Sequence, residues 1–337
     1  MKKKVLLKDI AQHVGVSTAL VSYVLNNQKE GRINKETADR IRKAAQELNY
    51  QPNQLAKGLK TQKSLTIGLI VADISNPFSS HIARIIEDEA KKSGYTVIFG
   101  SSDENAEKMQ DLINLLLNRQ VEGLIIAAAE NTEDQVQSLL KVGIPFVLID
   151  RYFPGITTNY VAIDNFAAGY KATKHLFDNG YSRIGLVTYK TELFHLQERA
   201  NGYKRFIESI HGTPLIEEVS VENVKEDVEK AVSRLLSQPQ PVEAIFFVTN
   251  MLTIHGIKHI NNLGIKVPNE LAVVGFDETD AFDLFYAPIT HVRQPMEELG
   301  KLSIRTLLDI IHNNTPVKTV NLDTELIIRT SSKAFAL

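Results

Sequence analysis

A regular alternation of strand-like and helix-like segments runs through the chain from residue 65 onward. Short apolar runs rich in Val, Ile and Leu predict buried strands at 65–71, 95–99, 123–128, 145–149, 160–163, 184–188, 244–249 and 271–276. Amphipathic segments that predict helices lie at 79–92, 106–119, 132–141, 166–179, 196–210, 224–236, 251–263 and 296–312. Continuous apolar strands separated by helices are typical of parallel sheets covered on both faces. We therefore expect an α/β body of two doubly wound parallel-sheet subdomains.

The first 50 residues carry a different pattern, with three short amphipathic segments and no strand signal. Gly15 ends the first predicted helix, Ser17 is a good N-cap for the second, and Asn34 is placed to cap a third. The residues expected to face inward are Leu7, Ile10, Ala11, Val14, Leu20, Val21, Val24, Leu25, Ala38, Ile41, Ala45 and Leu48. Two helices about a tight glycine turn form a helix-turn-helix, whose second helix can enter a DNA major groove. From this geometry alone, a helical hairpin that binds nothing is an equally good interpretation.

Charge is distributed unevenly along the chain. Residues 1–63 contain 13 Lys or Arg against 5 Asp or Glu, and the remaining residues contain 25 against 35, so a head of +8 precedes a body of −10. The total of −2 hides this difference. A basic head on an acidic body favours a nucleic-acid-binding module attached to a domain that avoids nucleic acid.

The segment 51–63 has the composition of a conditional helix. Pro52 suits a helix start and Leu55, Ala56 and Leu59 can share a face, but Gly58 and the short length make an isolated helix marginal. A linker that is helical only when supported is one interpretation, and a plain flexible linker is the other. The predicted domains are a helix-turn-helix headpiece at 1–50, a hinge helix or linker at 51–63, and a body at 64–337.

Composition and motifs exclude several classes of function. The chain has no cysteine, so disulfides and thiolate metal sites are excluded, and no apolar run is long enough to cross a membrane. The basic start resembles a signal peptide, but Lys8 and Asp9 end its apolar run, so we expect a cytoplasmic protein. Catalytic motifs and phosphate loops are lacking, which predicts a non-enzyme without a cofactor. His255 and His259 have metal-ligand spacing, but two ordinary helix histidines are the favoured interpretation.

Polar side chains follow several of the predicted strands. Ligands of doubly wound sheets bind beyond the carboxyl ends of the strands, where these residues should converge. Carboxylates, an amide, a guanidinium and an aromatic ring suit a polyhydroxylated ligand, because they bind hydroxyl groups and cover the apolar face of a sugar. The candidate ligand residues at these ends are Asp73 to Phe78, Asp150, Arg151, Asp164, Asn250 and Asp277, with Arg199 in the first turns of a helix. For each residue singly, loop capping or a surface salt bridge is at least as good an explanation.

Several stretches together resemble the lac-repressor (LacI/GalR) family of bacterial transcription regulators. They are Leu7-Lys8-Asp9-Ile10-Ala11, Gly15-Val16-Ser17, Val21-Ser22, Val24-Leu25-Asn26, Leu48 to Asn53 with Leu55, Ala56 and Leu59, Thr66 to Val71, Asp73 to Phe78, Gly275-Phe276-Asp277 and Pro288 to Pro295. The resemblance covers essentially the whole chain. It implies a homodimer, with each headpiece reading half of a near-palindromic DNA operator.

The resemblance also implies roles for individual headpiece and hinge residues. The residues that would read bases are Thr18, Ala19 and Tyr23, and those that would approach phosphates are Ser17, Ser22 and Asn26. The hinge residues that would contact the DNA are Asn53, Leu55, Ala56 and Lys57. Leu55 matches the leucine that wedges into the minor groove and kinks the duplex. Tyr23 stands where many members carry an arginine, so a bidentate guanine contact is lost.

For the body, the resemblance extends to periplasmic sugar-binding proteins with three crossovers between two subdomains. It implies a first subdomain of about 64–163 plus 289–321 and a second of about 164–288 plus 322–330. The strand after Pro288 and the helix at 296–312 would belong to the first, and the last strand, near 322–329, to the second. By the same resemblance, the effector-contacting positions would be Phe78, Asp150, Arg199, Asn250 and Asp277. The implied function is a regulator, a repressor by expectation, controlled by a sugar or sugar derivative between the subdomains. A sugar-binding receptor without a transcriptional role is the alternative, and a Rossmann-type enzyme is disfavoured because the phosphate loop is missing.

Overall fold

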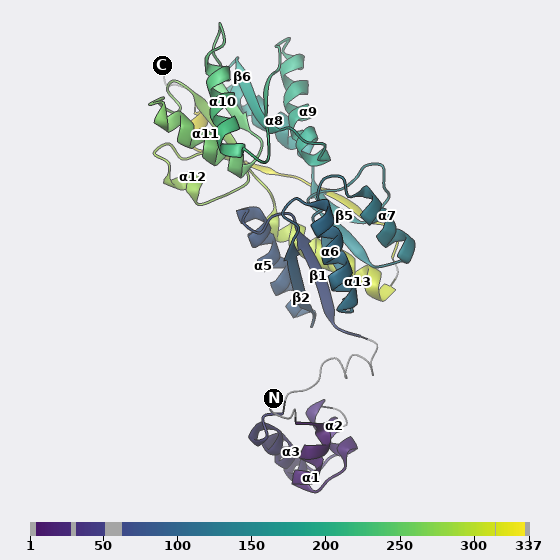
Figure 1. The fold of residues 1–337 in the computed structure, drawn as a ribbon. Helices are drawn as coiled ribbons and strands as arrows, with labels where there is room; N and C mark the ends of the chain where they lie inside the picture. The colour runs from purple at the N-terminus through teal and green to yellow at the C-terminus, as the bar shows by residue number, and fades with distance from the viewer. Residues whose placement is uncertain (1–4, 28–31, 51–62, 314, 334–337) are drawn as a thin grey trace. The chain divides into compact units, whose positions relative to one another are not determined.

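The computed structural model describes residues 5–27, 32–50, 63–313 and 315–333 (Figure 1). The chain divides into two compact units, residues 1–64 and residues 65–337. The predicted hinge residues Asn53, Leu55, Ala56 and Lys57 lie outside the described residues.

The first unit contains three helices, α1 (Leu7–Val14), α2 (Thr18–Leu25) and α3 (Lys35–Glu47). Gly15 ends α1 in the left-handed conformation, with φ of 76°, which glycine adopts without a steric penalty. The caps form as predicted: Leu20 N donates to Ser17 Oγ at 3.2 Å, and Glu36 N donates to Asn34 Oδ1 at 2.8 Å. The buried core consists of Ile10, Ala11, Val14, Val21, Val24, Ala38, Ile41, Ala44 and Ala45. The three-helix prediction for the headpiece is therefore confirmed.

The first sheet of the second unit is entirely parallel, in the order β11-β5-β4-β3-β1-β2. Its strands are β1 (Thr66–Val71), β2 (Thr96–Ser101), β3 (Gly123–Ile126), β4 (Phe146–Ile149), β5 (Tyr160–Ile163) and β11 (Thr319–Leu322). One face is covered by α5 (Pro77–Lys92) and α13 (Met296–Asn313), the other by α6 (Ala106–Asn118) and α7 (Glu133–Val142). Right-handed crossovers require this division, because the chain moves outward from β1 to β2 and then returns past β1 to β3.

The second sheet repeats this order as β12-β10-β9-β8-β6-β7, with β12 antiparallel at the edge. Its strands are β6 (Ile184–Tyr189), β7 (Leu215–Val219), β8 (Ala244–Phe247), β9 (Ala272–Phe276), β10 (Thr290–Arg293) and β12 (Glu325–Ile327). The helices are α8 (Asn165–Asp178), α9 (Phe194–Ser209), α10 (Val224–Leu236), α11 (Asn250–Asn262), the short α12 (Ala281–Leu284) and the 3-10 turn η1 (Thr330–Ser332). Figure 1 shows α8 beside α9, and α10 beside α11. Two doubly wound parallel sheets are thus confirmed.

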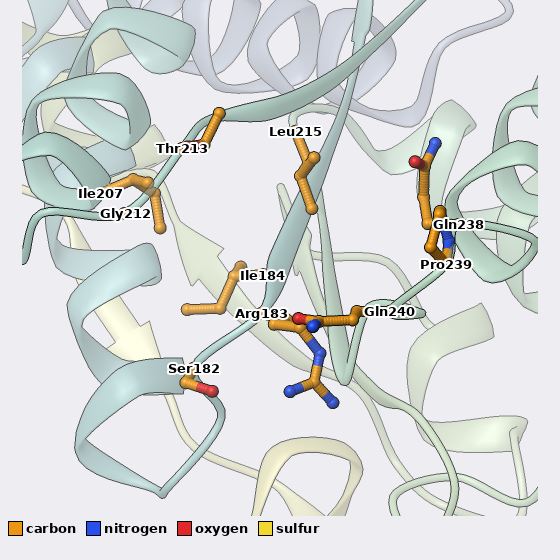
Figure 2. Close-up of a pocket in the computed structure, with 10 residues that line it drawn as sticks. All are labelled: Ser182, Arg183, Ile184, Ile207, Gly212, Thr213, Leu215, Gln238, Pro239 and Gln240. Atoms are coloured by element: carbon orange, nitrogen blue, oxygen red, sulfur yellow. The ribbon is translucent and has the colours of Figure 1, made fainter.

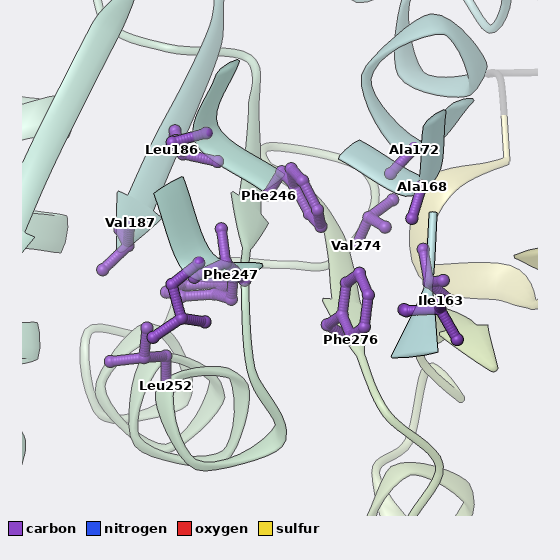
Figure 3. Close-up of a cluster of buried hydrophobic side chains, with 14 of the residues drawn as sticks. Ile163, Ala168, Ala172, Leu186, Val187, Phe246, Phe247, Leu252, Val274 and Phe276 are labelled. Atoms are coloured by element: carbon purple, nitrogen blue, oxygen red, sulfur yellow. The ribbon is translucent and has the colours of Figure 1, made fainter. Parts of the chain in front are cut away.

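Both faces of the second sheet are packed with apolar side chains (Figure 3). Phe246 and Phe247 are consecutive residues of β8, so their rings point to opposite faces, and both are fully buried. On the α8–α9 side, glycine permits unusually close packing of two helices. A Cβ atom at Gly169 of α8 would lie 2.1 Å from the carbonyl oxygen of Arg199 in α9. The backbone that carries Arg199 is therefore held directly against α8.

The chain passes between the two sheets three times, after β5, at residues 294–295 and at residues 323–324. Our assignment of the strand after Pro288 to the first subdomain is wrong. That strand, β10, pairs in parallel with β9, Thr290 opposite Val274, so the second sheet gains one more strand through α12 before the chain leaves it. The other two assignments are confirmed, because α13 packs on the first sheet and β12 pairs with β10.

Two strands, β7 and β11, were missed by the sequence analysis, and both lie at sheet edges. In β7, Glu217 and Glu218 interrupt the apolar pattern, and Glu217 pairs with Arg234 of α10 at 2.6 Å. In β11, polar residues alternate with half-buried ones. Edge strands tolerate and often require charged or polar residues, so their apolar signal is weak.

Candidate functional site

The carboxyl ends of the strands of both sheets meet at the junction between the two subdomains. Asn250 Nδ2, at the start of α11, donates to Asn76 Oδ1, before α5, at 3.0 Å. On another side of the junction, Glu192 N donates to Glu130 Oε1. A cavity of about 410 Å³ opens at this junction, within the range usual for small-molecule sites. Its walls are Pro77, Phe78, His81, Asp277, Glu278, Thr279, Asp280, Gln294 and Met296.

Two predicted ligand residues, Asp150 and Asp277, occupy equivalent places in the two sheets. Each follows the fourth strand of its sheet, β4 or β9, and each donates its backbone N–H at 2.9 Å to the next strand, at Val161 O and Val292 O respectively. Both have positive φ, 67° and 64°, which is uncommon outside glycine but tolerated by Asp. Sharp left-handed turns of this kind aim both carboxylates into the junction.

Burial dominates the ionisation of both carboxylates. It raises the pKa of Asp150 to about 6, against the opposing attraction of Arg151 and Arg199. It also raises the pKa of Asp277, opposed by Arg199 and by the hydrogen bond that Gln294 Nε2 donates to Asp277 Oδ1 at 2.7 Å. Asp150 Oδ1 is buried without a hydrogen-bond partner among the described residues. An acceptor of this kind is suited to a hydroxyl donor.

Arg199 is held rigidly between the two aspartates. Its Nε donates to Asn165 Oδ1 and its Nη1 to Val248 O, both at 2.8 Å, and the guanidinium lies over the Phe276 ring at 3.6 Å from the centroid. Burial lowers the pKa of Arg199, and Asp277 and Asp150 oppose that shift. These contacts hold the guanidinium in one orientation, as recognition of a polar ligand requires.

The five predicted ligand residues therefore come together in space. Asn250 is fully buried and donates its backbone N–H to the Asp277 carboxylate, and Phe78 lies half-buried in the cavity wall beside Asp277. Asp164 does not join them, because it is exposed and caps α8 by accepting from Ala167 N at 2.8 Å. Asp73 likewise makes a local turn, accepting from Ser75 N at 2.8 Å. For these two carboxylates the structure supports the loop-capping interpretation.

Further residues lie at the junction besides these five. Arg151, a strand-end candidate from its place after β4, forms a two-pronged ion pair with Glu104 at 2.6 and 2.7 Å. Gln294 could have been found from its position after β10, and Asn76 lies in the candidate stretch before α5. His195 lies in the first turn of α9, shortly after β6, and was not considered. It is buried, its Nδ1 has no partner among the described residues, and burial beside Arg151 and Arg199 lowers its pKa far below the usual value.

In the headpiece, the predicted DNA-contacting residues of α2 lie on one face. Ser17, Thr18, Ala19 and Asn26 are exposed, whereas Ser22 and Tyr23 are half-buried. The side chain of Asn26 donates to Ser22 O at 2.8 Å, which fixes the end of this face. The opposite side of α2 packs into the headpiece core, as the sequence predicted. The exposed face is free of the core and has the geometry of a recognition helix.

A second cavity, of about 430 Å³, lies at the opposite end of the second sheet (Figure 2). It surrounds the amino-terminal ends of β6 and β7, away from the strand ends that bind ligands in this architecture. Its one cation, Arg183, is engaged by Pro241 O at 2.9 Å and Glu243 Oε1 at 2.7 Å. No cluster of metal-ligating side chains occurs among the described residues, and His259 bonds to Ser233 Oγ at 3.0 Å. Within the same residues, no helix is long and apolar enough to span a bilayer.

A helix-turn-helix headpiece joined to a two-lobed α/β body with a polar junction defines a ligand-responsive DNA-binding regulator. A family model described as "Bacterial regulatory proteins, lacI family" matches residues 6–53, and one described as "Periplasmic binding protein-like domain" matches residues 173–332. The ribose operon repressor of Halalkalibacterium halodurans is 31% identical to this chain, over 97% of both sequences. The chain therefore belongs to the lacI family of bacterial regulatory proteins, and it is a DNA-binding transcriptional regulator rather than an enzyme.

Two solved structures are similar to this chain in their three-dimensional fold. The lac repressor dimer, bound to operator and the anti-inducer ONPF, matches 98% of this chain and 100% of its own length with a TM-score of 0.89 at 22% identity. A LacI family transcriptional regulator from Enterococcus faecium with bound ribose matches 80% of this chain and 99% of its own length, with a TM-score of 0.71 at 26% identity. The two-lobed fold, headpiece included, is shared with the lac repressor.

Proposed function

We propose that this chain is a repressor whose affinity for a near-palindromic operator is set by a sugar bound between the two subdomains. The effector-binding residues of this proposal are Phe78, Asp150, Arg199, Asn250 and Asp277, extended by Arg151, His195 and Gln294. The observation that carries it is the pair of buried aspartates held on opposite lobes around Arg199. Relatives support it, since one represses a ribose operon and another holds ribose.

The proposal extends to the operator-binding residues and to the domains. Base reading falls to Thr18, Ala19 and Tyr23, and phosphate contact to Ser17, Ser22 and Asn26, the exposed or half-buried face of α2. The hinge would occupy 51–63, with Asn53, Leu55, Ala56 and Lys57 at the DNA. The working form is a homodimer in the cytoplasm, where chromosomal DNA lies. Sugar binding changes the relative orientation of the lobes and thereby the affinity of the headpieces for the operator.

The test is a selection of genomic DNA fragments on the purified full chain, at fixed salt, with and without a panel of sugars. We expect a recurring near-palindromic sequence whose recovery changes with one sugar. Recovery of fragments without any shared sequence would contradict the proposal.

A matched pair of variants checks which face of the headpiece binds. Ala19→Glu places a charge on the exposed face of α2 and should abolish operator binding through repulsion from phosphate. Gln46→Glu makes the same charge change at an exposed position of α3, and operator binding should fall far less. Equal losses in both variants would show that net charge, and not the α2 face, determines binding.

A further inference from the structure

The junction between the lobes contains few positive charges, and its two buried guanidiniums, Arg151 and Arg199, lie among a larger number of carboxylates. The Arg151 guanidinium donates from both terminal nitrogens to Glu104, at 2.6 and 2.7 Å, and also to Ala128 O at 3.2 Å. Its remaining Nε lies 3.8 Å from Asp150 Oδ2. Arg151 therefore stands between two carboxylates and has no charge left to balance a third anion.

Arg199, the other buried cation, is also committed. Asn165 and Val248 occupy its Nε and Nη1, Phe276 covers one face of the guanidinium, and the charges of Asp277 and Asp150 both act on it. The cavity walls add the carboxylates of Glu278 and Asp280, against one exposed histidine, His81. The balance of charge around the junction is negative.

The polar atoms without a partner at the junction would be stabilised by hydrogen bonds from a ligand rather than by an opposite charge. At the junction, the buried atoms without a partner among the described residues include Asp150 Oδ1, Arg151 Nε, His195 Nδ1 and Gln294 Oε1. Two of these, Asp150 Oδ1 and Gln294 Oε1, can only accept, so a ligand must bring donors to them. The His195 ring is uncharged near neutral pH, because two guanidiniums and burial oppose its protonation, and it can donate or accept.

We propose that the cleft selects an uncharged, hydroxyl-rich ligand of monosaccharide size and discriminates against the same carbon skeleton bearing a phosphate or a carboxylate. Hydroxyl groups both donate and accept, so they satisfy the acceptor atoms and Arg151 Nε together. An added anion is instead buried beside two aspartates, where carboxylates outnumber the guanidiniums, and that arrangement is strongly unfavourable. The inference rests on the proposed function in one respect, the placement of the effector in this cleft.

The first experiment measures binding of matched sugars to the purified full chain by calorimetry at pH 7.5. The probes are ribose with ribose 5-phosphate, glucose with glucose 6-phosphate and glucuronate, and galactose with galacturonate. We expect at least one neutral sugar to bind, and its acidic counterparts to bind at least about tenfold more weakly. An acidic sugar that binds as tightly as its neutral partner, or a panel in which nothing binds, overturns the inference.

A second experiment tests whether the discrimination against acidic sugars depends on the Arg151–Glu104 ion pair. Glu104→Gln leaves the Arg151 guanidinium without its main counter-charge, so the ratio of acidic to neutral dissociation constants should fall by about tenfold. Glu107→Gln is the control, since Glu107 is an exposed carboxylate in the first turn of α6. A ratio unchanged in Glu104→Gln, or changed equally in both variants, overturns the inference.

Operator binding is followed in parallel with the same sugars, which separates the two hypotheses. An operator response to an acidic sugar alone overturns the charge selectivity and leaves the regulator proposal intact. A sugar that binds in the cleft without changing operator affinity contradicts the regulator proposal and leaves the charge selectivity intact.

Discussion

At the scale of single residues, the two sheets of the body carry carboxylates at equivalent positions. Asp150 and Asp277 close the fourth strand of each sheet at the ligand side. At the other side, Glu122 accepts from Leu65 N at 2.6 Å, and Glu243 accepts from Ser182 N at 2.8 Å, so each carboxylate holds the start of a first strand. The first pair is buried with a raised pKa, whereas backbone N–H donors and Arg183 help to lower the pKa of the part-exposed Glu243.

The raised pKa of Asp150 makes sugar affinity depend on pH. Free protein holds a proton on Asp150 below about pH 6, and hydroxyl donors favour the ionised form, so binding must release that proton. We expect affinity for a neutral sugar to fall as pH drops through 6, by at most about tenfold per pH unit. Calorimetry between pH 5 and 8 measures it. Asp150→Asn, which also tolerates positive φ, should bind more weakly and lose this dependence.

His195 makes the stability of the body depend on pH as well. Its folded pKa lies well below the unfolded value of 6.5, so stability is complete above pH 6.5 and is lost as pH falls below it, by at most about 1.4 kcal/mol per unit. Asp150 acts in the other sense, since its raised pKa favours the folded state at low pH. The difference between wild type and His195→Gln isolates the histidine. Urea unfolding followed by circular dichroism should show that His195→Gln gains stability relative to wild type between pH 7 and 5, and a constant difference would contradict it.

At the scale of elements, the site depends on how closely α8 and α9 approach. Gly169 faces the backbone of Arg199, and Gly202 faces the backbone of Phe166, where a Cβ would lie 2.2 Å from the carbonyl oxygen. Neither neighbour is a flexible side-chain end that could move aside. The pair of glycines therefore sets the position of the Arg199 guanidinium as well as the helix spacing.

We expect Gly169→Ala to reduce stability by about 3 kcal/mol, because the new methyl group must push two backbones apart. Sugar affinity should fall as well, since Arg199 moves with α9. Gly155→Ala is the matched control: nothing lies within 4 Å of its Cβ position and its φ is not positive, so stability should be unchanged or slightly higher. Thermal unfolding and calorimetry measure both effects, and equal behaviour of the two variants would contradict the close-packing argument.

The cap of α3 belongs to the headpiece alone. Asn34→Ala removes the acceptor for Glu36 N and should destabilise the headpiece by about 1 kcal/mol, while Asn34→Asp should retain most of the stability. Hydrogen exchange of the α3 amides reports the loss. Sugar binding to the body should be the same in both variants, and a change there would show coupling that these contacts do not explain.

The same elements show where sequence reasoning succeeds and where it ends. Strands buried on both faces, such as β1 and β9, have unbroken apolar runs, and the strand-end rule located Asp150 and Asp277. The edge strand β7 was not predicted because Glu217 and Glu218 interrupt its run of apolar residues. An apolar run does not specify which sheet it joins, which is why β10 was misplaced. His195 lies in the first turn of α9, and was missed because the strand-end rule was applied to the loops and not to the start of the helix that follows β6.

At the scale of the whole molecule, charge is separated between the two units, with +8 on residues 1–63 and −10 on the remainder. We expect operator affinity to fall steeply with salt, with a log–log slope of about −0.9 for each phosphate contacted. Affinity for a neutral sugar should change little over the same range, because no ions are released from a buried, uncharged contact. Fluorescence anisotropy and calorimetry across a salt series test this, and parallel salt dependences would contradict it.

The three passages between the sheets also determine how the protein must be made. The first sheet needs α13 and β11, residues 296–322, to cover one face and complete its edge, although its first strand begins at Thr66. All strands of the second sheet except β12 are therefore synthesised before the first sheet can be completed. Until α13 is made, α5 alone covers that face, and the strands beyond its reach keep apolar side chains exposed for most of translation, when a growing chain is most prone to aggregation.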